Sequence, residues 1–397
     1  MKKTIALFML LVMMTGLLSG CGSQAAAPAE TQAPAQQEAA AAAEAPAAAE
    51  ETVETQVITD TMGREVTLKK DIERIIAIPW PWTSFVFAVD GSADKIVSMS
   101  ATALDSYKNC MFEVLAPGLA DSDTGFIDDG NSDGGSFGTV NIEELAKLNP
   151  DVVIIYKRDA ELMLPTLEAA GIPTVVFDFG GLKEVQDGLL LLGEMLGEEQ
   201  MQKAQTIVNW HQETAALLEE RLANVPEEDR PTVLMLRDGN LRLYNSGFSN
   251  NMMKQAGGIV ATVDENGEIV KGGDMNFEQL LRWDPDYILL GNFANHTPDE
   301  IYNNIMADQD WSQLTAVKNH HVYKIPMGIY RWDPPSTEAH LLLLWEAKMM
   351  HPELFQDIDV YAKTAEFYQT IFGYTLTDAD YDMIFHTELN ANSEPIQ

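Results

Sequence analysis

The sequence predicts an α/β fold in which two Rossmann-like lobes are joined by one long α-helix and enclose a ligand cleft. Short apolar runs alternate with helix-like segments along most of the chain, and a long amphipathic helical segment divides this pattern into two halves. One helix-to-strand segment is also nearly repeated, once in each half. Such alternation is typical of parallel sheets that are covered by helices.

The composition is that of a folded, acidic protein. Of the 397 residues, 46% are hydrophobic, and 61 acidic against 25 basic residues give a formal net charge of -36. A field of this sign repels phosphate backbones and anionic membrane surfaces. Nucleic acid is therefore not expected as a partner.

The N-terminal residues predict export and a tether. Residues 1–20 place two lysines before an apolar run and small residues, which is the layout of a signal peptide. The following Cys21 ends a segment that resembles the lipobox of bacterial lipoproteins, where the cysteine is lipidated; an ordinary signal peptide is the alternative. Residues 21–56 are rich in Ala, Pro, Gln and Glu and predict a disordered tether. With Cys21 lipidated, Cys110 would have no disulfide partner.

Residues 57–180 predict the N-terminal lobe. VITDTMGREVTLKK has the alternation of a hairpin, RIIAI, KIVSMS, VVIIY and TVVFD are strand-like runs, and TSFVFAVDG and LPTLEAAG are helix-like. Residues 181–225 predict the interlobe helix, with Ile207, Trp210, Leu217 and Leu218 recurring at helical spacing. Residues 226–397 restart the pattern with TVLML, NNMMKQAGG, VYKIP and STEAHLLLLWEAKMM, and they predict the C-terminal lobe.

The repeated segment reads VNIEELAKLNPDVVIIY at residues 140–156 and MNFEQLLRWDPDYILLG at residues 275–291. Each copy has an asparagine that can cap a helix, an apolar helix face, a proline that ends the helix, and a buried strand. The repeat therefore predicts the same helix-to-strand unit in each lobe. Chance similarity between two ordinary units is the alternative.

The ends of the predicted strands supply the candidate ligand-binding residues, because ligands of open α/β sheets collect beyond the carboxyl ends of the strands. These residues are Trp80, Trp82, Ser100, Tyr156, Lys157, Arg237, Asn292, Tyr330, Arg331 and Trp332. Aromatic rings with a few cations suit a large, flat, anionic or chelated ligand. Surface ion pairs are the alternative for the arginines, and packing over the next helix is the alternative for Trp332.

Several segments together resemble the substrate-binding lipoproteins of ATP-binding-cassette importers for iron-siderophores, haem and cobalamin. They are DTMGREVTLKKDIERIIAI, the two NxExLxxxxPD segments, QAGGIV, AVKNHHVYKIP and WDPPSTEAHLLLLWEAKMMHPELF, within residues 57–374. The resemblance implies a monomer, held by lipid at the outer face of the bacterial cytoplasmic membrane, that captures a metal chelate between its lobes. It also implies delivery to a permease dimer with its ATPase subunits, and no intrinsic cofactor.

The same resemblance gives the repeat a second meaning. In cobalamin-binding relatives one glutamate on each lobe pairs with permease arginines, and the matching positions here are Glu143 and Glu278. Solvated acids that favour a helix N-terminus are the alternative. The chain departs from the family at residues 79–84, where relatives often have a threonine-glutamate pair, and in the Asp/Gly/Ser-rich loop 121–138. These departures leave the ligand subclass open, and the loop is read as calcium-binding or simply solvated.

The sequence gives little support for an enzyme. GxSxG and HExxH are absent, Cys110 lies in an apolar setting, and His320 and His321 lie in a turn before a strand. We therefore expect a binding protein without a metal site of its own. Binding of a free metal ion or oxyanion and a chelatase-like enzyme are the alternatives.

Overall fold

The computed structural model describes residues 53–121, 126–127, 141–238, 241–306 and 309–396. The predicted signal peptide, Cys21, most of the tether and most of the loop 121–138 lie outside these residues. The first described element is the predicted hairpin, in which β1 (Thr55–Thr59) pairs with β2 (Glu65–Lys69) in antiparallel register.

The N-terminal lobe is built on a parallel sheet of five strands with the order β5-β4-β3-β6-β7. Its strands are β3 (Ile75–Ala77), β4 (Ile96–Ser100), β5 (Phe126–Ile127), β6 (Val152–Tyr156) and β7 (Thr174–Phe177). Its helices are α1 (Trp82–Asp90), α2 (Ala101–Tyr107), α3 (Met111–Leu115), α4 (Ile142–Lys147) and α5 (Ala160–Ala169). Strands β3, β6 and β7 are buried along almost their whole length, which explains their continuous apolar runs.

The C-terminal lobe has a second, mixed sheet with the order β11-β9-β8-β12-β13, and β10 also pairs with β8. Its strands are β8 (Thr232–Asp238), β9 (Arg242–Leu243), β10 (Ile259–Val260), β11 (Gly273–Asp274), β12 (Tyr287–Leu290) and β13 (Val322–Lys324). The helices of this lobe are α8 (Gly247–Gln255), α9 (Phe277–Trp283), α10 (Pro298–Tyr302) and α11 (Thr315–Lys318). Strands β8, β10, β12 and β13 are parallel, as the predicted strand and helix alternation requires.

The repeated segments form equivalent units in the two lobes. Asn141 caps α4 and Asn276 caps α9 through their side chains, and each helix is followed by a strand beside the first parallel strand of its lobe. Asp151 accepts hydrogen bonds from the backbone N–H groups of Glu73 and Arg74, just before β3. Asp286 accepts equivalent bonds from the backbone and hydroxyl of Thr232, at the start of β8. The aspartate of the shared Pro-Asp pair therefore links each repeat, through hydrogen bonds, to the start of the neighbouring strand.

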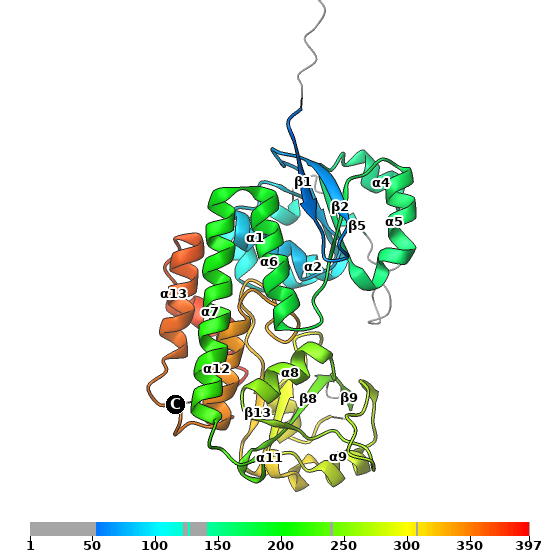
Figure 1. The fold of residues 1–397 in the computed structure, drawn as a ribbon. Coiled ribbons are helices and arrows are strands. Elements are labelled where there is room, and N and C mark those ends of the chain that lie inside the picture. Colours follow the sequence, from blue (N-terminus) through cyan, green and yellow to red (C-terminus); the bar gives the residue numbers. More distant parts are fainter. Residues whose placement is uncertain (1–52, 122–125, 128–140, 239–240, 307–308, 397) are drawn as a thin grey trace, which may run out of the picture. The chain divides into compact units, whose positions relative to one another are not determined.

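The predicted long helical segment is divided into two helices, α6 (Leu182–Leu196) and α7 (Glu198–Leu222), which lie side by side (Figure 1). The break occurs at Gly197, whose φ of 123° departs from the helical range. The helices approach closely at Gly193, which has no side chain. A Cβ at this position would lie only 2.7 Å from the Cα of Met201. The long helix that runs beside both lobes is thus α7 alone.

The C-terminal helices α12 (Ala339–Met350), α13 (Val360–Phe372) and α14 (Asp378–Phe385) complete the protein. Helix α12 packs against α7, where His211 bonds to the carbonyl of Thr337. Helix α13 returns to the N-terminal lobe, where Phe372 stacks on Phe87 with ring centroids 4.9 Å apart. One continuous core therefore includes residues of both lobes, α7 and the C-terminal helices. Among the described residues, no helix has the length and apolar character needed to span a bilayer.

The contact between α6 and α1 provides a stability prediction. A Cβ at Gly188 would lie 2.1 Å from the indole of Trp82, a side chain that is fully buried and in contact with Phe85 and Phe177. We expect Gly188→Ala to lower the free energy of unfolding by about 1–3 kcal/mol, since a filled core has no room for the methyl group. Urea denaturation measures this loss.

Gly180→Ala is the matched control, because a Cβ there meets no atom within 4 Å. The control is expected to change stability by less than about 0.5 kcal/mol. A Gly188→Ala variant as stable as the original protein would show that α6 does not pack on Trp82 as described.

Candidate ligand-binding site between the lobes

Six aromatic side chains from the two lobes form one connected group, which we name the interlobe aromatic cluster. Its members are Trp80, Tyr156 and Phe179 of the N-terminal lobe and Tyr244, Phe293 and Tyr330 of the C-terminal lobe. Trp80 joins the lobes, because its ring centroid lies 5.5 Å from that of Phe293 and 6.0 Å from that of Tyr330. Within the N-terminal lobe, Tyr156 stacks on Phe179 at 3.9 Å.

The cluster lies where the strands of both sheets end. Trp80, Tyr156 and Phe179 follow or end β3, β6 and β7, while Phe293 and Tyr330 follow β12 and β13. These are carboxyl ends of parallel strands, the edge at which open α/β sheets bind ligands. The geometry therefore brings together the two sheet edges that the strand pattern singled out.

Arg331 supplies a buried cation beside the cluster. Its side chain is 5% exposed, and the guanidinium lies 4.5 Å from the ring centroid of Phe293. Nε donates to the carbonyl of Asn292 at 2.9 Å, and Nη1 donates to the hydroxyl of Tyr330 at 3.3 Å. Nη2 forms an ion pair with Asp105 of the N-terminal lobe at 3.0 Å. Burial raises the pKa of Tyr330 to about 12, so its hydroxyl stays neutral beside the arginine.

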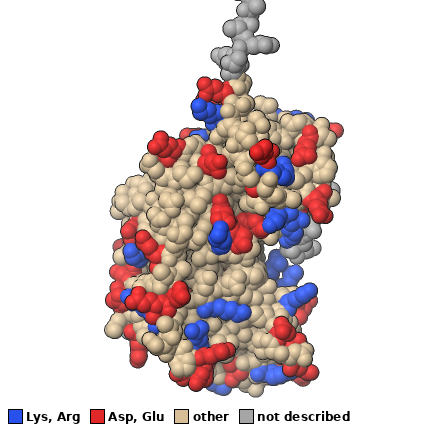
Figure 2. Space-filling model, in the orientation of Figure 1, with Lys and Arg blue, Asp and Glu red and all other residues tan. Residues whose placement is uncertain are grey.

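Arg237 is the second cation of the site and is half-buried near the end of β8. Its guanidinium lies 5.7 Å from the ring centroid of Phe293, the ring that Arg331 also contacts. Within the described part of the chain, Arg237 has no carboxylate partner. Lys157, in contrast, is exposed and pairs with Asp178 at 3.0 Å. Figure 2 shows Lys and Arg side chains gathered between the lobes on one side of the visible face.

A buried polar network holds the loops that carry these groups. Lys324 Nζ donates to the carbonyls of Gly291 and Ala294 at 2.8 and 2.6 Å, and burial lowers its pKa to about 8. Asp333 accepts from the backbone N–H and the side-chain amide of Asn292. Burial raises the pKa of Asp333, although Arg331 and Lys324 act in the opposite direction. The loop after β12 is therefore fixed from both sides, which orients Phe293 and Asn292.

The structure places three of the predicted site residues in other surroundings. Trp82 and Trp332 are fully buried: Trp82 packs on Phe85 and Phe177, and Trp332 packs against Phe385. Ser100 is also fully buried, and its hydroxyl caps α2 by accepting from the N–H of Ala103. Trp332 and Ser100 therefore stabilise the core and the helix start. Trp82 is a core residue whose ring also contacts Phe179 at the edge of the cluster, with ring centroids 6.4 Å apart.

Four residues of the site were absent from the sequence prediction, namely Asp105, Phe179, Tyr244 and Phe293. Phe179 and Phe293 follow strands β7 and β12 by two or three residues, so the strand-end rule would have included them. Tyr244 and Asp105 lie beyond a short hairpin strand and within helix α2, and no local sequence signal marks them.

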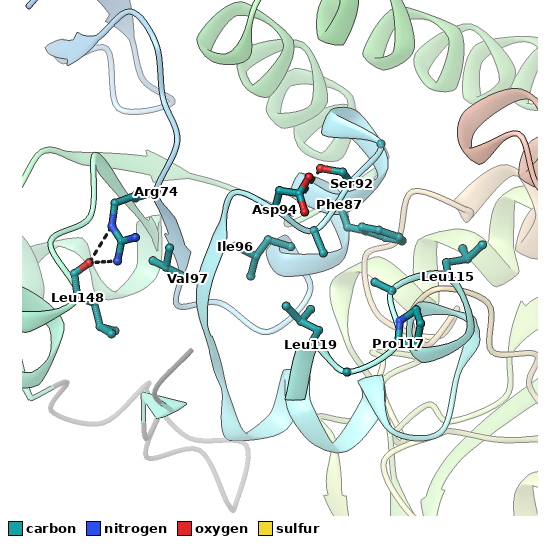
Figure 3. A pocket seen from close by; sticks show the side chains of 14 residues that line it. Arg74, Phe87, Ser92, Asp94, Ile96, Val97, Leu115, Pro117, Leu119 and Leu148 are labelled. Atoms are coloured by element: carbon teal, nitrogen blue, oxygen red, sulfur yellow. Dashed lines mark hydrogen bonds between the residues drawn. The ribbon is translucent and has the colours of Figure 1, made fainter. Parts of the chain in front are cut away.

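A separate open pocket of about 670 Å³ lies in the N-terminal lobe and is shown in Figure 3. Its lining includes Arg74, Ile96 and Leu119, and Arg74 donates to the carbonyl of Leu148. Arg74 and Ile96 mark the amino ends of β3 and β4, opposite to the strand ends that carry the aromatic cluster. Within the residues described, no group of three His, Cys, Asp or Glu side chains could hold a metal ion.

Comparison with known proteins identifies the class. The family model described as periplasmic binding protein matches residues 75–327. The chain is 27% identical over 338 residues to the molybdate-binding protein MolA of Haemophilus influenzae, which covers 80% of this chain and 91% of that protein. It is 24% identical over 366 residues to the ABC transporter substrate-binding lipoprotein YvrC of Bacillus subtilis. This match covers 90% of this chain and 100% of that protein.

Solved structures support the same class of protein. A periplasmic solute binding protein from Veillonella parvula is 37% identical, with a TM-score of 0.76 over 85% of this chain and 99% of that one. The chain therefore belongs to the periplasmic binding protein family, and it is an extracytoplasmic substrate-binding protein of ABC importers. The two-lobed α/β fold that the sequence predicted is confirmed. Burial raises the pKa of the Cys110 thiol to about 12, so this thiol stays protonated near neutral pH.

Proposed function

We propose that this protein captures an anionic metal chelate at the interlobe aromatic cluster and delivers it to the permease of an ABC importer. The observation that carries the proposal is Arg237, a half-buried guanidinium without a carboxylate partner in the described part of the chain, beside buried Arg331. The chain has 61 acidic and 25 basic residues, so an unpaired cation in an aromatic setting favours an anion from outside.

The aromatic surroundings favour a chelate over a bare ion. A small ion needs several polar groups that converge on one point, whereas the groups here are mainly the faces and edges of six rings. Ring faces cover apolar parts of an organic ligand, and guanidinium groups bind its carboxylates or other oxyanions. Catecholate, carboxylate and tetrapyrrole chelates have this mixed character.

Binding of a free oxyanion is the second candidate. It is favoured by the 27% identity to a molybdate-binding protein over 91% of the length of that protein. In this case Arg237 and Arg331 would hold the oxyanion directly, and the aromatic rings would only exclude water.

A thermal-shift screen of the purified protein separates the two candidates. The panel contains haem, several ferric siderophores, ferric citrate, cobalamin, molybdate, tungstate and simple metal salts. A ligand present at about 100 times its dissociation constant stabilises the folded state by roughly 2.7 kcal/mol. Stabilisation by one class of chelate supports the proposal, and stabilisation by molybdate or tungstate alone supports the second candidate.

We also propose that Glu143 and Glu278 dock the protein on the permease, and that lipid on Cys21 holds it at the membrane. Both glutamates are exposed, follow equivalent asparagine caps, and form no ion pair within the described residues. One acid on each lobe would suit the two subunits of a permease dimer, and their charge would steer the encounter.

Reversal of both charges, Glu143→Lys with Glu278→Lys, is expected to reduce uptake about tenfold or more while leaving ligand affinity unchanged. Uptake of the labelled ligand by cells and titration of the purified variant measure the two effects. Glu144, which pairs with Lys147 on the same helix, provides the control Glu144→Lys. Normal uptake by the double variant would remove the docking role.

A further inference from the structure

The ion pair between Asp105 and Arg331 joins the two lobes at the candidate site. Asp105 lies on α2 of the N-terminal lobe, and Arg331 follows β13 of the C-terminal lobe. The carboxylate Oδ2 is 3.0 Å from Nη2 of the guanidinium. The bond therefore crosses the region in which a ligand would lie.

The two partners of this ion pair are held very differently. The side chain of Arg331 is 5% exposed and is fixed by Asn292, by Tyr330 and by the ring of Phe293. The side chain of Asp105 is 73% exposed, and in the described part of the chain its carboxylate has no second partner. Arg331 is thus preorganised, while rotation of Asp105 into water breaks a single contact.

We infer that Asp105 is a displaceable internal competitor that occupies the anion position of Arg331 until the ligand replaces it. The inference rests on the proposed function, because it assigns the displaced carboxylate to the place of an anionic group of the ligand. A buried guanidinium retains a counter-ion at all times, so exchange of one anion for another avoids leaving it unpaired. The exchange also removes a bond between the lobes, which couples ligand entry to their separation.

This competitor selects among ligands. A group that binds Arg331 no better than a single exposed carboxylate gains nothing from the exchange. An anion with two oxygens for the planar guanidinium, or with a second charge for nearby Arg237, gains more than the protein loses. Polyanionic chelates and dianions are therefore favoured over monoanions.

Titration calorimetry with ferric citrate and sodium molybdate tests the inference. Asp105→Asn keeps the size of the side chain and removes its charge, so we expect the anion that binds the original protein to bind the variant about fivefold more tightly. Asp94→Asn is the control, since Asp94 is also exposed, lies at the far pocket and forms no ion pair in the described residues. The control should leave affinity unchanged.

A second arm needs no ligand. Urea unfolding of Asp105→Asn, Arg331→Gln and the double variant should show coupling between the two positions equal to about a fivefold change in the unfolding equilibrium constant. Absence of coupling would overturn the ion pair and the inference with it. Binding that is equal in the original protein and Asp105→Asn would overturn the competitor role alone. Failure of the original protein to bind either probe or any member of the screening panel would overturn the proposed function together with the inference.

Discussion

Replacement of Arg331 by glutamine is expected to weaken binding of the anionic ligand by at least about 100-fold. The guanidinium is buried and already oriented by Asn292 and Tyr330. An anionic ligand can therefore bind this positive charge without the entropic cost of ordering the arginine side chain. Glutamine cannot carry the charge or present the planar fork. Titration calorimetry with the best ligand of the screen measures the loss.

Two further variants make this result interpretable. Arg331→Lys keeps the charge but loses the fork, and it should recover only part of the affinity. Arg282→Gln removes an exposed arginine of α9 and should have no effect. Thermal unfolding without ligand checks that each variant is folded. An unchanged dissociation constant in folded Arg331→Gln would remove Arg331 from the site.

Acid is expected to destabilise the contact between α7 and α12, because His211 and His340 are buried there as neutral rings. Their ring centroids are 5.5 Å apart, and Trp210 stacks on His340. Within the described residues, Nδ1 of each histidine has no hydrogen-bond partner. Burial lowers the pKa of His211 to about 4, and burial, His211 and Lys363 lower that of His340. The folded protein therefore binds fewer protons here than the unfolded chain.

The sign of the effect follows from this difference. The stability due to His211 is fully present above its ordinary pKa near 6.5 and is lost as the pH falls towards 4, by about 3 kcal/mol in total. Glu338 acts in the opposite sense, because burial raises its pKa to about 7 and its contribution grows as the pH falls. The net change of the whole protein therefore combines contributions of both signs, and a variant is needed to isolate the contribution of His211.

The variant His211→Gln isolates the contribution of this histidine to the pH dependence of stability. Relative to the original protein, the variant should gain about 3 kcal/mol of stability when the pH is lowered from about 7 to about 4. Urea unfolding across this range measures the difference, and His320→Gln, at an exposed position, is the control. A constant difference between variant and original protein at every pH would show that His211 is not buried as a neutral ring.

Much of the fold could be predicted because its signals are local. The repeated segments contain the asparagine caps of α4 and α9, the proline that follows each of these helices, and the apolar runs of β6 and β12. The break between α6 and α7 was missed, because Gly197 is preceded and followed by good helix formers and apolar residues continue at helical spacing. The return of α13 to the N-terminal lobe depends on contacts between distant residues such as Phe87 and Phe372.

The candidate site could be predicted only as a set of strand ends. That rule found Trp80, Tyr330 and Arg331, but it gives no side-chain direction, so it also included Trp82 and Trp332, which point into the core. The direction of Trp82 is set by the gap that Gly188 leaves on α6. Asp105 could not be predicted from the sequence, because it is an exposed aspartate on a helix. Its ion pair with Arg331 forms only when the fold brings the two lobes together.

We propose that an anionic metal chelate binds between the lobes at the aromatic cluster. Anomalous X-ray scattering from crystals of the loaded protein, collected at the absorption edge of the bound metal, locates the metal directly. We expect one peak between Trp80 of the N-terminal lobe and Phe293 and Arg331 of the C-terminal lobe, with the organic part of the chelate against the rings. A peak at another place, or an isolated oxyanion between the two arginines, would contradict the account.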